Sequence, residues 1–513
     1  MDQKQLNAFI KRRHPRYKEN EAHWQFLNAC YVGGRTWFDQ NIFVYHKEGE
    51  NEFKARRDRA YRFNHTKEIV DLVGKYIFKV PASRQEDAPE IVKSFWKRAT
   101  RNGLGIGDYM RQIERKASIF GRVWVVVDST KEVESNNRAE EKASDARIIS
   151  YVVEPYNMLD MSYDENQELN WALIAEYERD DADPFTSSGA MLPRFRLWTR
   201  KGWVLFKATP KSGTDEFMVE KIGEGEHDLG IVPVFAADNI ASDDPYVSPA
   251  LIGDIAYLDR AVANYLSNLD AIIQDQTFSQ LAMPAQGMMP GDEAYKKVLE
   301  LGTKRIFIYD GEGGAQPFYL SPDIKQAQLI LDVINKIINE IYHSVGVAGE
   351  RTKQDNALGI DNSSGVAKAY DFERVNALLA SKADSLEMVE NRLVKLVMAW
   401  AGETYDEENP MVEYPDNFDV RGLYDEFEIA ARLAAIDAPD EVRREQMKLV
   451  IDKLFPKLKD DLKKKMLEEL KQWPPKLDAM LETMGANSIS SESMSGAGKS
   501  PAGDTSTNPG QST

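Results

Sequence analysis

Apolar residues recur at helical spacing near the start of the chain and then switch to an alternating pattern. The helical spacing predicts helices over about 4–30, with a basic interruption, and over 64–79, 88–101 and 109–120. The apolar run RVWVVVD at 122–128 is predicted to be a buried strand. An antiparallel sheet packed on the early helices gives an α+β domain over 1–248. Its further strands are expected at 148–153, 169–179, 194–199, 203–208 and 217–221.

Two long amphipathic helices are predicted in the middle of the chain, at 249–277 and 323–345. In the first, apolar residues recur at gaps of four and three from Leu251 to Ile272, which gives a helix of about 43 Å. Its other face is polar, and the second helix repeats the design with a stripe of isoleucines. The polar residues of the first helix are Asp254, Asp259, Arg260, Asn264, Asn268 and Asp270. The stripe of the second is Ile330, Ile334, Ile337 and Ile341.

The segment between these helices, 278–322, contains a hairpin signal. Strand-like residues at 304–309 and 315–320 flank the turn sequence DGEGG, which begins at Asp310. A small α/β unit is therefore expected between the two long helices. A plain antiparallel helix pair in one globular core is the alternative, but it leaves this insert unexplained.

A polar segment and a much longer helix follow. Residues 346–364 contain almost no apolar anchor, whereas 365–401 keep one apolar stripe for roughly 37 residues, or about 55 Å of helix. A helix of this length must cross more than one layer of the fold. Residues 412–420 are expected to return to the sheet domain as a strand within 365–423. Residues 424–484 are predicted to be helical, and the Ser-, Gly- and Thr-rich end, 485–513, to be disordered.

Composition narrows the class of protein. The 42% hydrophobic and 29% charged content is normal for a globular chain, no stretch approaches eighteen apolar residues, and the N-terminal sequence lacks the apolar run of a signal peptide. We therefore expect an intracellular product without a membrane partner. The net charge of −18 opposes tight binding of nucleic acid, because a protein that holds duplex neutralises phosphates with Lys and Arg. Either DNA is not a partner, or it must pass without being held.

Short motifs add no chemistry. The sequence SMSGAGKS at 493–500 ends like a phosphate-binding loop, but Ser493 replaces the first glycine and Pro501 blocks a following helix. The glycines at 103–107 have the wrong spacing for a dinucleotide site. The six histidines never occur four residues apart, and Cys30 is the single cysteine, so neither a protein-built zinc site nor an internal disulfide is expected. No cofactor and no catalytic residue are predicted.

The order of these segments resembles the portal, or head–tail connector, proteins of tailed bacteriophages. The phrases RRDRAY at 56–61, LGIVPV at 229–234 and SGVA at 364–367 are also similar to that family. The resemblance covers about 1–484 and lies mainly in the order of the elements. It implies a mainly helical α+β fold with an α/β wing, a two-helix stem, a small α/β clip, a long wing-crossing helix and a helical crown. On this scheme 1–248 is the wing, 249–277 and 323–345 the stem, 278–322 the clip, 346–364 the tunnel loop and 424–484 the crown.

The resemblance also implies a function and partners. The subunits would form a homo-oligomeric ring, usually a dodecamer, at one capsid vertex, first in the host cytoplasm and then in the virion. Double-stranded DNA would pass through it without sequence specificity during packaging and ejection. The terminase large subunit, a head–tail adaptor and the major capsid and scaffolding proteins would be its protein partners. The residues expected to face DNA are Lys325, Lys336, Glu350, Arg351, Lys353 and Gln354. Those expected to face the terminase or adaptor are Lys304, Arg305, Asp310 and Glu312.

Two other classes remain open from the sequence. A different structural or adaptor protein of a virion would share the composition, and a large intracellular enzyme can have catalytic residues outside any short motif. These classes differ from a portal in assembly, because a portal must form a closed ring. The charged residues expected near DNA also have a plain alternative role as solvated side chains of helices and loops.

Overall fold

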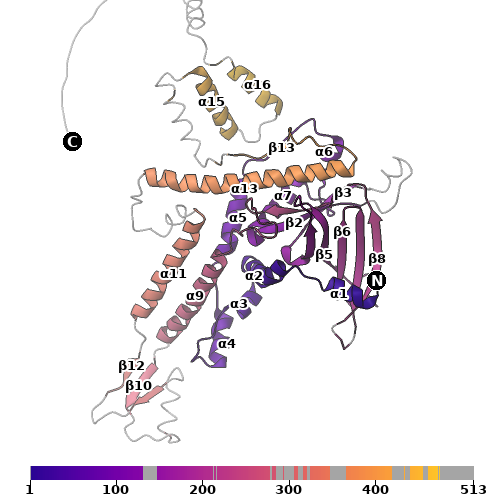
Figure 1. The fold of residues 1–513 in the computed structure, drawn as a ribbon. Helices are drawn as coiled ribbons and strands as arrows, with labels where there is room; N and C mark the ends of the chain where they lie inside the picture. Colours follow the sequence, from indigo (N-terminus) through magenta and orange to yellow (C-terminus); the bar gives the residue numbers. More distant parts are fainter. Residues whose placement is uncertain are drawn as a thin grey trace, which may run out of the picture. The chain divides into compact units, whose positions relative to one another are not determined.

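The computed structural model describes residues 2–130, 147–211, 213–214, 216–277, 280–284, 293, 306–309, 316–320, 324–346, 365–416, 418, 433, 439–454, 460–471 and 473. The chain divides into two compact units, Met1–Phe418 and Asp419–Thr513, and each is described by itself. Within the first unit, a run of helices is followed by a run of strands and then by long helices (Figure 1). The mixed α and β composition agrees with the predicted fold class.

The N-terminal helical region confirms most of the predicted helices but divides the first of them. Helix α1 (Gln3–Ile10) is closed at its start by a reciprocal pair of bonds between Asp2 and Gln5. Pro15 then opens α2 (Pro15–Val32) and holds His14 in an extended conformation, which explains the break. The polar helices α3 (Arg35–Asn41) and α4 (Glu50–Arg59) were not predicted because they lack an apolar stripe. The remaining helices are α5 (His65–Ile77), α6 (Glu90–Lys97) and α7 (Ile106–Phe120).

Two antiparallel sheets follow the helices. Strand β2 (Arg122–Ser129) is central in a three-stranded sheet, between β3 (Ile148–Val153) and β9 (Val234–Asp238). The second sheet has five strands in chain order, which start at β4 (Met158–Tyr163), a strand that the sequence reading missed. The expected strands are thus present, but in two sheets instead of one. The other strands are β5 (Leu169–Arg179), β6 (Met191–Thr199), β7 (Gly202–Pro210) and β8 (Phe217–Glu226).

Gly121 allows β2 to begin directly after α7. Its φ is +83°, and a Cβ atom there would lie 1.8 Å from the carbonyl oxygen of Ser248. We expect Gly121→Ala to lower the free energy of unfolding by about 3 kcal/mol or more, measured by urea denaturation. Gly103→Ala is the matched control, because Gly103 has φ +87° and nothing within 4 Å of an added Cβ. It should cost only about 1–2 kcal/mol; equal losses would show that the contact with Ser248 does not matter.

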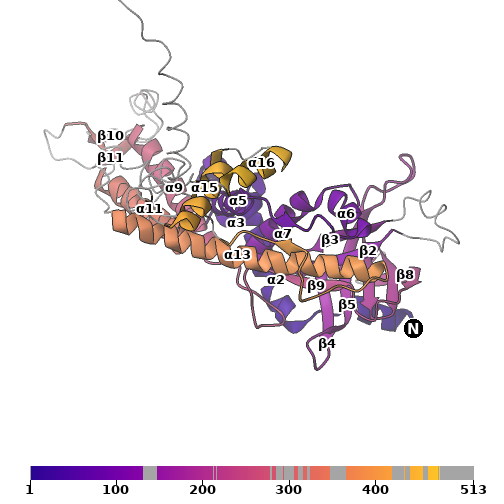
Figure 2. The same ribbon diagram turned by 90° about the horizontal axis from the view of Figure 1, so that it is seen from above.

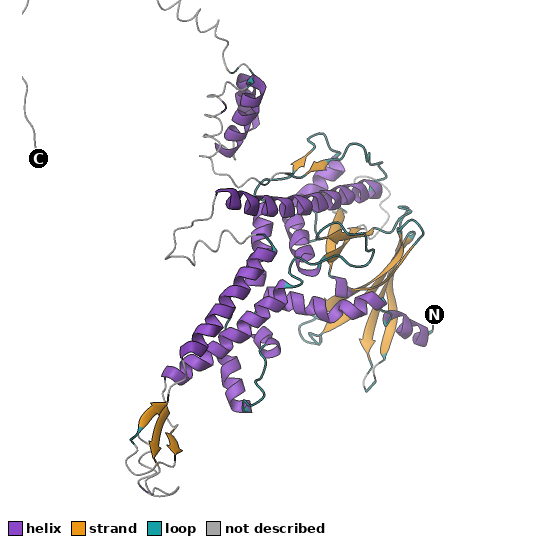
Figure 3. Cartoon of the chain, turned by 60° about the vertical axis from the view of Figure 1, so that its left-hand side comes forward, coloured by secondary structure: helices purple, strands orange, loops and turns teal. Residues whose placement is uncertain are grey.

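The two long central helices are α9 (Ile255–Thr277) and α11 (Ile324–Ser344), and they pack side by side (Figure 3). Helix α11 confirms its prediction to within a residue at each end. Helix α9 starts six residues later than predicted, since residues 251–254 form turns. Pro249 precedes these turns, and the amide of Leu251 is bonded to the carbonyl of Ser118 on α7 (3.0 Å). This tertiary contact overrides the helical pattern.

The predicted hairpin between the long helices is wrong. Strands β11 (Ile306–Tyr309) and β12 (Phe318–Leu320) are present, but β10 (Gln280–Pro284) lies between them. Strand β10 pairs parallel with β11 and antiparallel with β12. The short segment QLAMP has no strand pattern of its own, so the sequence predicts a local turn between β11 and β12 instead. The turn residues at 310–315 lie outside the described residues.

The longest helix is α13 (Gly365–Trp400), which confirms the predicted helix almost to the residue. In Figure 2 it crosses the first unit, with α5, α6 and α7 on one side and β4, β5 and β9 on the other. The expected strand at 412–420 is shorter, β13 (Val412–Glu413), and pairs with β1 (Ser83–Arg84) rather than with either larger sheet. In the second unit, the described helices are α15 (Asp440–Leu454) and α16 (Asp460–Leu470).

Candidate functional site: the α9–α11 helix pair and α13

The α9–α11 pair joins the three-stranded sheet β10–β11–β12 to the rest of the first unit (Figures 1 and 3). Its core is built from the apolar stripes that the sequence predicts. Val262 and Leu266 of α9 are buried, as are Ile334 and Ile341 of α11. Most other side chains of the pair are polar or partly exposed, so the question is what their polar faces contact.

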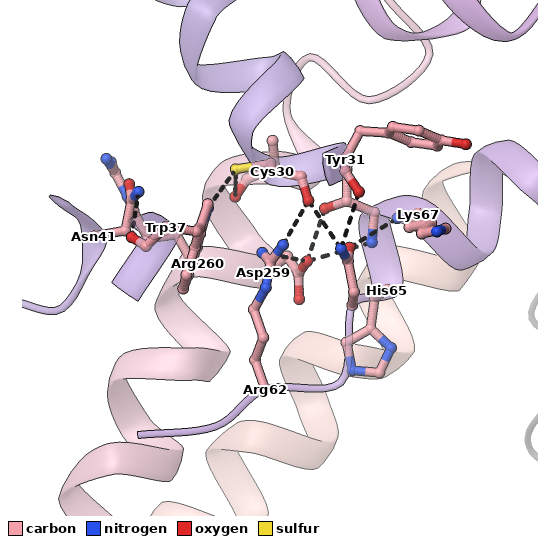
Figure 4. A network of polar contacts seen from close by, with 12 residues as sticks. Cys30, Tyr31, Trp37, Asn41, Arg62, His65, Lys67, Asp259 and Arg260 are labelled. Atoms are coloured by element: carbon pink, nitrogen blue, oxygen red, sulfur yellow. Dashed lines mark hydrogen bonds and ion pairs between the residues drawn. The ribbon is translucent and has the colours of Figure 1, made fainter. Parts of the chain in front are cut away.

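Asp259 fixes the first part of α9 to the N-terminal helices. Its side chain is fully buried, and its Oδ2 atom accepts hydrogen bonds from Thr66 Oγ1 (2.7 Å) and from Arg62 (3.2 Å) (Figure 4). The Arg62 guanidinium also bonds the carbonyl of Cys30 and lies 3.8 Å from the centre of the Trp37 ring. Burial raises the pKa of the Cys30 thiol, against the opposing effect of its bond from Trp37. This cluster is therefore a buried ion pair with a neutral thiol beside it.

The same face of α9 is held at three further positions. Asn264 accepts from the amide of Phe43 (2.9 Å) and donates to the carbonyl of Asn41 (2.9 Å). Ser267 accepts from Arg56 (3.0 Å), which also donates to both carboxylate oxygens of Glu48 and to the carbonyl of Phe43. Asp270 pairs with Arg59 (3.1 Å). The polar face of α9 thus faces the chain's own residues 41–66 for much of its length.

The exposed polar face of the pair belongs to α11. Lys325 and Lys336, which the sequence analysis expected near DNA, are both exposed. With Leu329, Asp332 and Glu340 they recur at steps of three and four, so they lie along one side of the helix. Two cations and two carboxylates alternate on this side, and their charges cancel.

The other predicted site residues lie outside the part of the chain that the structure describes. They are Glu350, Arg351, Lys353 and Gln354, and also Lys304, Arg305, Asp310 and Glu312. The structure does show how the end of α11 is held. Tyr342 donates to Glu68 of α5 (2.6 Å) and contacts His65 (3.1 Å), so the last turn of α11 is tied to the N-terminal helices.

Helix α13 carries two buried polar clusters that the sequence analysis missed. The Lys382 ammonium is buried and donates to Glu114 (3.2 Å) and Ser118 (2.6 Å) of α7 and to Asn239 (2.6 Å) after β9. Burial lowers the pKa of Lys382, while Glu114 acts in the opposite direction. One side chain therefore joins α13 to both a helix and the edge of a sheet.

The second cluster lies two turns further along α13. Glu390 is fully buried and accepts two bonds from Arg84 (2.6 and 3.0 Å) and one from the Tyr414 hydroxyl (2.8 Å). Burial raises the pKa of Tyr414 well above its ordinary value, and Glu390 raises it further. Burial would lower the pKa of Arg84, but Glu390 raises it above its usual range. The sequence contains a signal for both clusters. Lys382 and Glu390 stand at the helical spacing of the apolar stripe Leu379, Leu386 and Leu393, so charged residues occupy positions that the pattern marks as buried.

Two kinds of site are not found among the described residues. No group of three or more His, Cys, Asp or Glu side chains there is placed to hold a metal ion. In the same part of the chain, none of the helices is both long and apolar enough to cross a membrane.

The comparison with protein families decides what kind of molecule this is. A family model described as phage portal protein, SPP1 Gp6-like, matches residues 6–473, nearly the whole chain. The chain belongs to this family. As a phage portal protein it forms a ring at one vertex of a capsid and is a component of a virion.

Solved structures of gene transfer agent particles add only a distant likeness. A chain from the neck of an empty gene transfer agent particle, computed with C6 symmetry, is 12% identical; the match covers 79% of this chain and 95% of that chain, with a TM-score of 0.35. A chain from the virion of a native gene transfer agent particle is 11% identical, with coverages of 82% and 98% and a TM-score of 0.36. Scores this low carry no argument about this portal protein. A comparison with curated proteins finds no match.

Proposed function

We propose that the ring of this portal protein is the conduit through which double-stranded DNA enters and leaves the capsid. The family match over 6–473 carries the proposal. In it, α9 and α11 are the stem, the β10–β11–β12 sheet belongs to the clip, and residues 346–364 are the tunnel loop. The clip contacts the terminase large subunit and later a head–tail adaptor, and the wing and crown contact capsid and scaffolding proteins.

The contacts of α9 favour α11 as the helix that faces the channel. Asp259, Asn264 and Ser267 are bonded to residues 41–66 and are therefore covered within the subunit. The face of α11 with Lys325, Asp332, Lys336 and Glu340 is exposed and electrically balanced. A balanced wall neither attracts the phosphate backbone strongly nor repels it along the path. Such a wall suits a duplex that must slide.

The first test is assembly. Purified protein imaged by negative-stain electron microscopy should show closed rings with a central hole. A sample that contains only monomers at all protein concentrations would contradict the proposal. Deletion of 346–363 should leave the rings intact and reduce packaging or retention of DNA. Loss of rings in that variant would mean that this loop is needed for assembly instead.

The balanced charge of α11 gives a second prediction. Asp332→Lys with Glu340→Lys should give the ring a measurable affinity for duplex DNA and slow packaging. The reason is that each added phosphate contact steepens the dependence of log K on log salt by about 0.9. Filter binding at several salt concentrations measures the slope. The control is Asp181→Lys with Glu220→Lys, the same change on exposed residues of the five-stranded sheet region. If the control binds DNA equally well, α11 is not the helix that faces the duplex.

A further inference from the structure

Charge is distributed unevenly over the first unit. Residues 61–121, which include α5, α6 and α7, contain 12 Lys and Arg against 7 Asp and Glu. Residues 158–245, which include the five-stranded sheet and the connection to α9, contain 8 Lys and Arg against 18 Asp and Glu. Figure 2 shows α5 and α7 on one side of α13 and β4, β5 and β9 on the other. Cations are therefore in excess in the helical segment on one side of α13, and carboxylates are in excess in the segment that contains the strands on its other side.

The helical side carries a group of exposed cations, which we call the basic flank. They are Lys75 of α5, Lys79 just after α5, and Arg111 and Arg115 of α7. Helices α5 and α7 pack together, and the Arg111 guanidinium lies 5.3 Å from the centre of the Phe78 ring. Arg111 pairs with Asp108 on its own helix. Among the described residues, no ion pair is formed by Lys75, Lys79 or Arg115. This group is therefore solvated in the single subunit.

The other side contains a groove of about 1000 Å³ along α13, which we call the acidic groove. Its lining includes the turn between β4 and β5, the connection after β9, and residues 387–396 of α13. Six carboxylates line it against three cations: Glu168, Asp238, Asp243, Asp244, Glu387 and Glu407, with Arg122, Arg392 and Lys395. Asp238, Glu407 and Asp244 are paired with Arg122, Lys395 and Arg16 respectively. Glu168 and Asp243 are exposed and form no ion pair with a described residue.

We infer that the acidic groove of one subunit receives the basic flank of the next copy in the ring. The inference rests on the proposed function, because a closed ring joins two different surfaces of each subunit, one to each neighbour. The two surfaces border the same helix, α13, from opposite sides, and their charges are complementary. Charge complementarity favours this contact and disfavours the contact of either surface with a copy of itself. This complementarity makes the acidic groove of each subunit face the basic flank of its neighbour.

The test uses two variants of the chain, each of which is expected not to close a ring alone. Variant one carries Lys75→Glu and Arg115→Glu, and variant two carries Glu168→Lys and Asp243→Lys. Each places like charges at the substituted positions of every interface, so its ring fraction by native mass spectrometry at about 150 mM salt should fall at least about tenfold. A mixture of the two should restore rings of alternating subunits, because every interface then has opposite charges again.

Controls separate this contact from folding and from the proposed function. All four residues are exposed, so both variants should melt within a few degrees of the parent protein. Lys4→Glu with Lys211→Glu makes the same charge change on exposed side chains of α1 and the β7–β8 loop, and should leave the rings unchanged. If either variant assembles alone like the parent, or if the mixture of folded variants forms no rings, the inference is overturned. If the parent itself forms no rings, the proposed function fails instead.

Discussion

Asp259→Ala is expected to lower the free energy of unfolding by about 3–5 kcal/mol. The substitution removes the partner of Arg62, whose side chain is only 4% exposed, and leaves a buried guanidinium without its countercharge. It also removes the acceptor for the Thr66 hydroxyl. Urea denaturation of parent and variant at matched protein concentration measures the difference. Because this cluster holds the start of α9, the variant should also lose protection from hydrogen exchange along α9.

Asp270→Ala is the control on the same helix. Its pair with Arg59 is more exposed, with 20% and 43% of the two side chains accessible, so solvent screens it. The expected loss is below about 1 kcal/mol. In the double variant Asp259→Ala with Arg62→Met, no unpaired charge remains, and part of the stability should return. A double variant that is less stable than Asp259→Ala alone would show that the contacts of Arg62 with Cys30 and Trp37 matter more than the ion pair.

The sequence predicts those elements whose own periodicity is uninterrupted. Helix α13 has one continuous stripe, and strand β2 is a continuous apolar run, so both were found with nearly correct ends. Strand β10 does not meet this condition. Its five residues have no periodicity of their own, and they form a strand because they pair with β11 and β12, which come later in the chain. The start of α9 fails for a similar reason, since a bond from Leu251 to α7 decides where the helix begins.

The polar residues that position the helices were harder to predict than the helices. The helical pattern places Asp259 on the polar face of its helix, and the structure shows that this residue is buried against Arg62 and Thr66. Whether a carboxylate beside an apolar stripe is solvated or paired depends on a partner nearly 200 positions away. Lys325 and Lys336, which were expected to face DNA, are exposed. Their expected role toward DNA stays a prediction.

Lys382 gives the second large expected effect. Lys382→Met should lower the free energy of unfolding by about 3–5 kcal/mol, because it leaves the Glu114 carboxylate buried without a cation and removes the donor to Ser118 and Asn239. Thermal and urea denaturation both measure the loss. Lys395→Met is the control on the same helix: its pair with Glu407 is largely exposed, so the expected loss is below about 1 kcal/mol.

A compensating change shows whether the loss comes from the stranded charge. In Lys382→Met with Glu114→Gln, the neutral amide can still accept from the Ser118 hydroxyl, and no charge is buried. Most of the lost stability should therefore return. If the double variant is as unstable as Lys382→Met, the bonds from Lys382 to Ser118 and Asn239, rather than its pairing with Glu114, hold α13 against α7 and the end of β9. Helix α13 borders both the basic flank and the acidic groove. We therefore expect Lys382→Met to form fewer rings than the double variant Lys382→Met with Glu114→Gln.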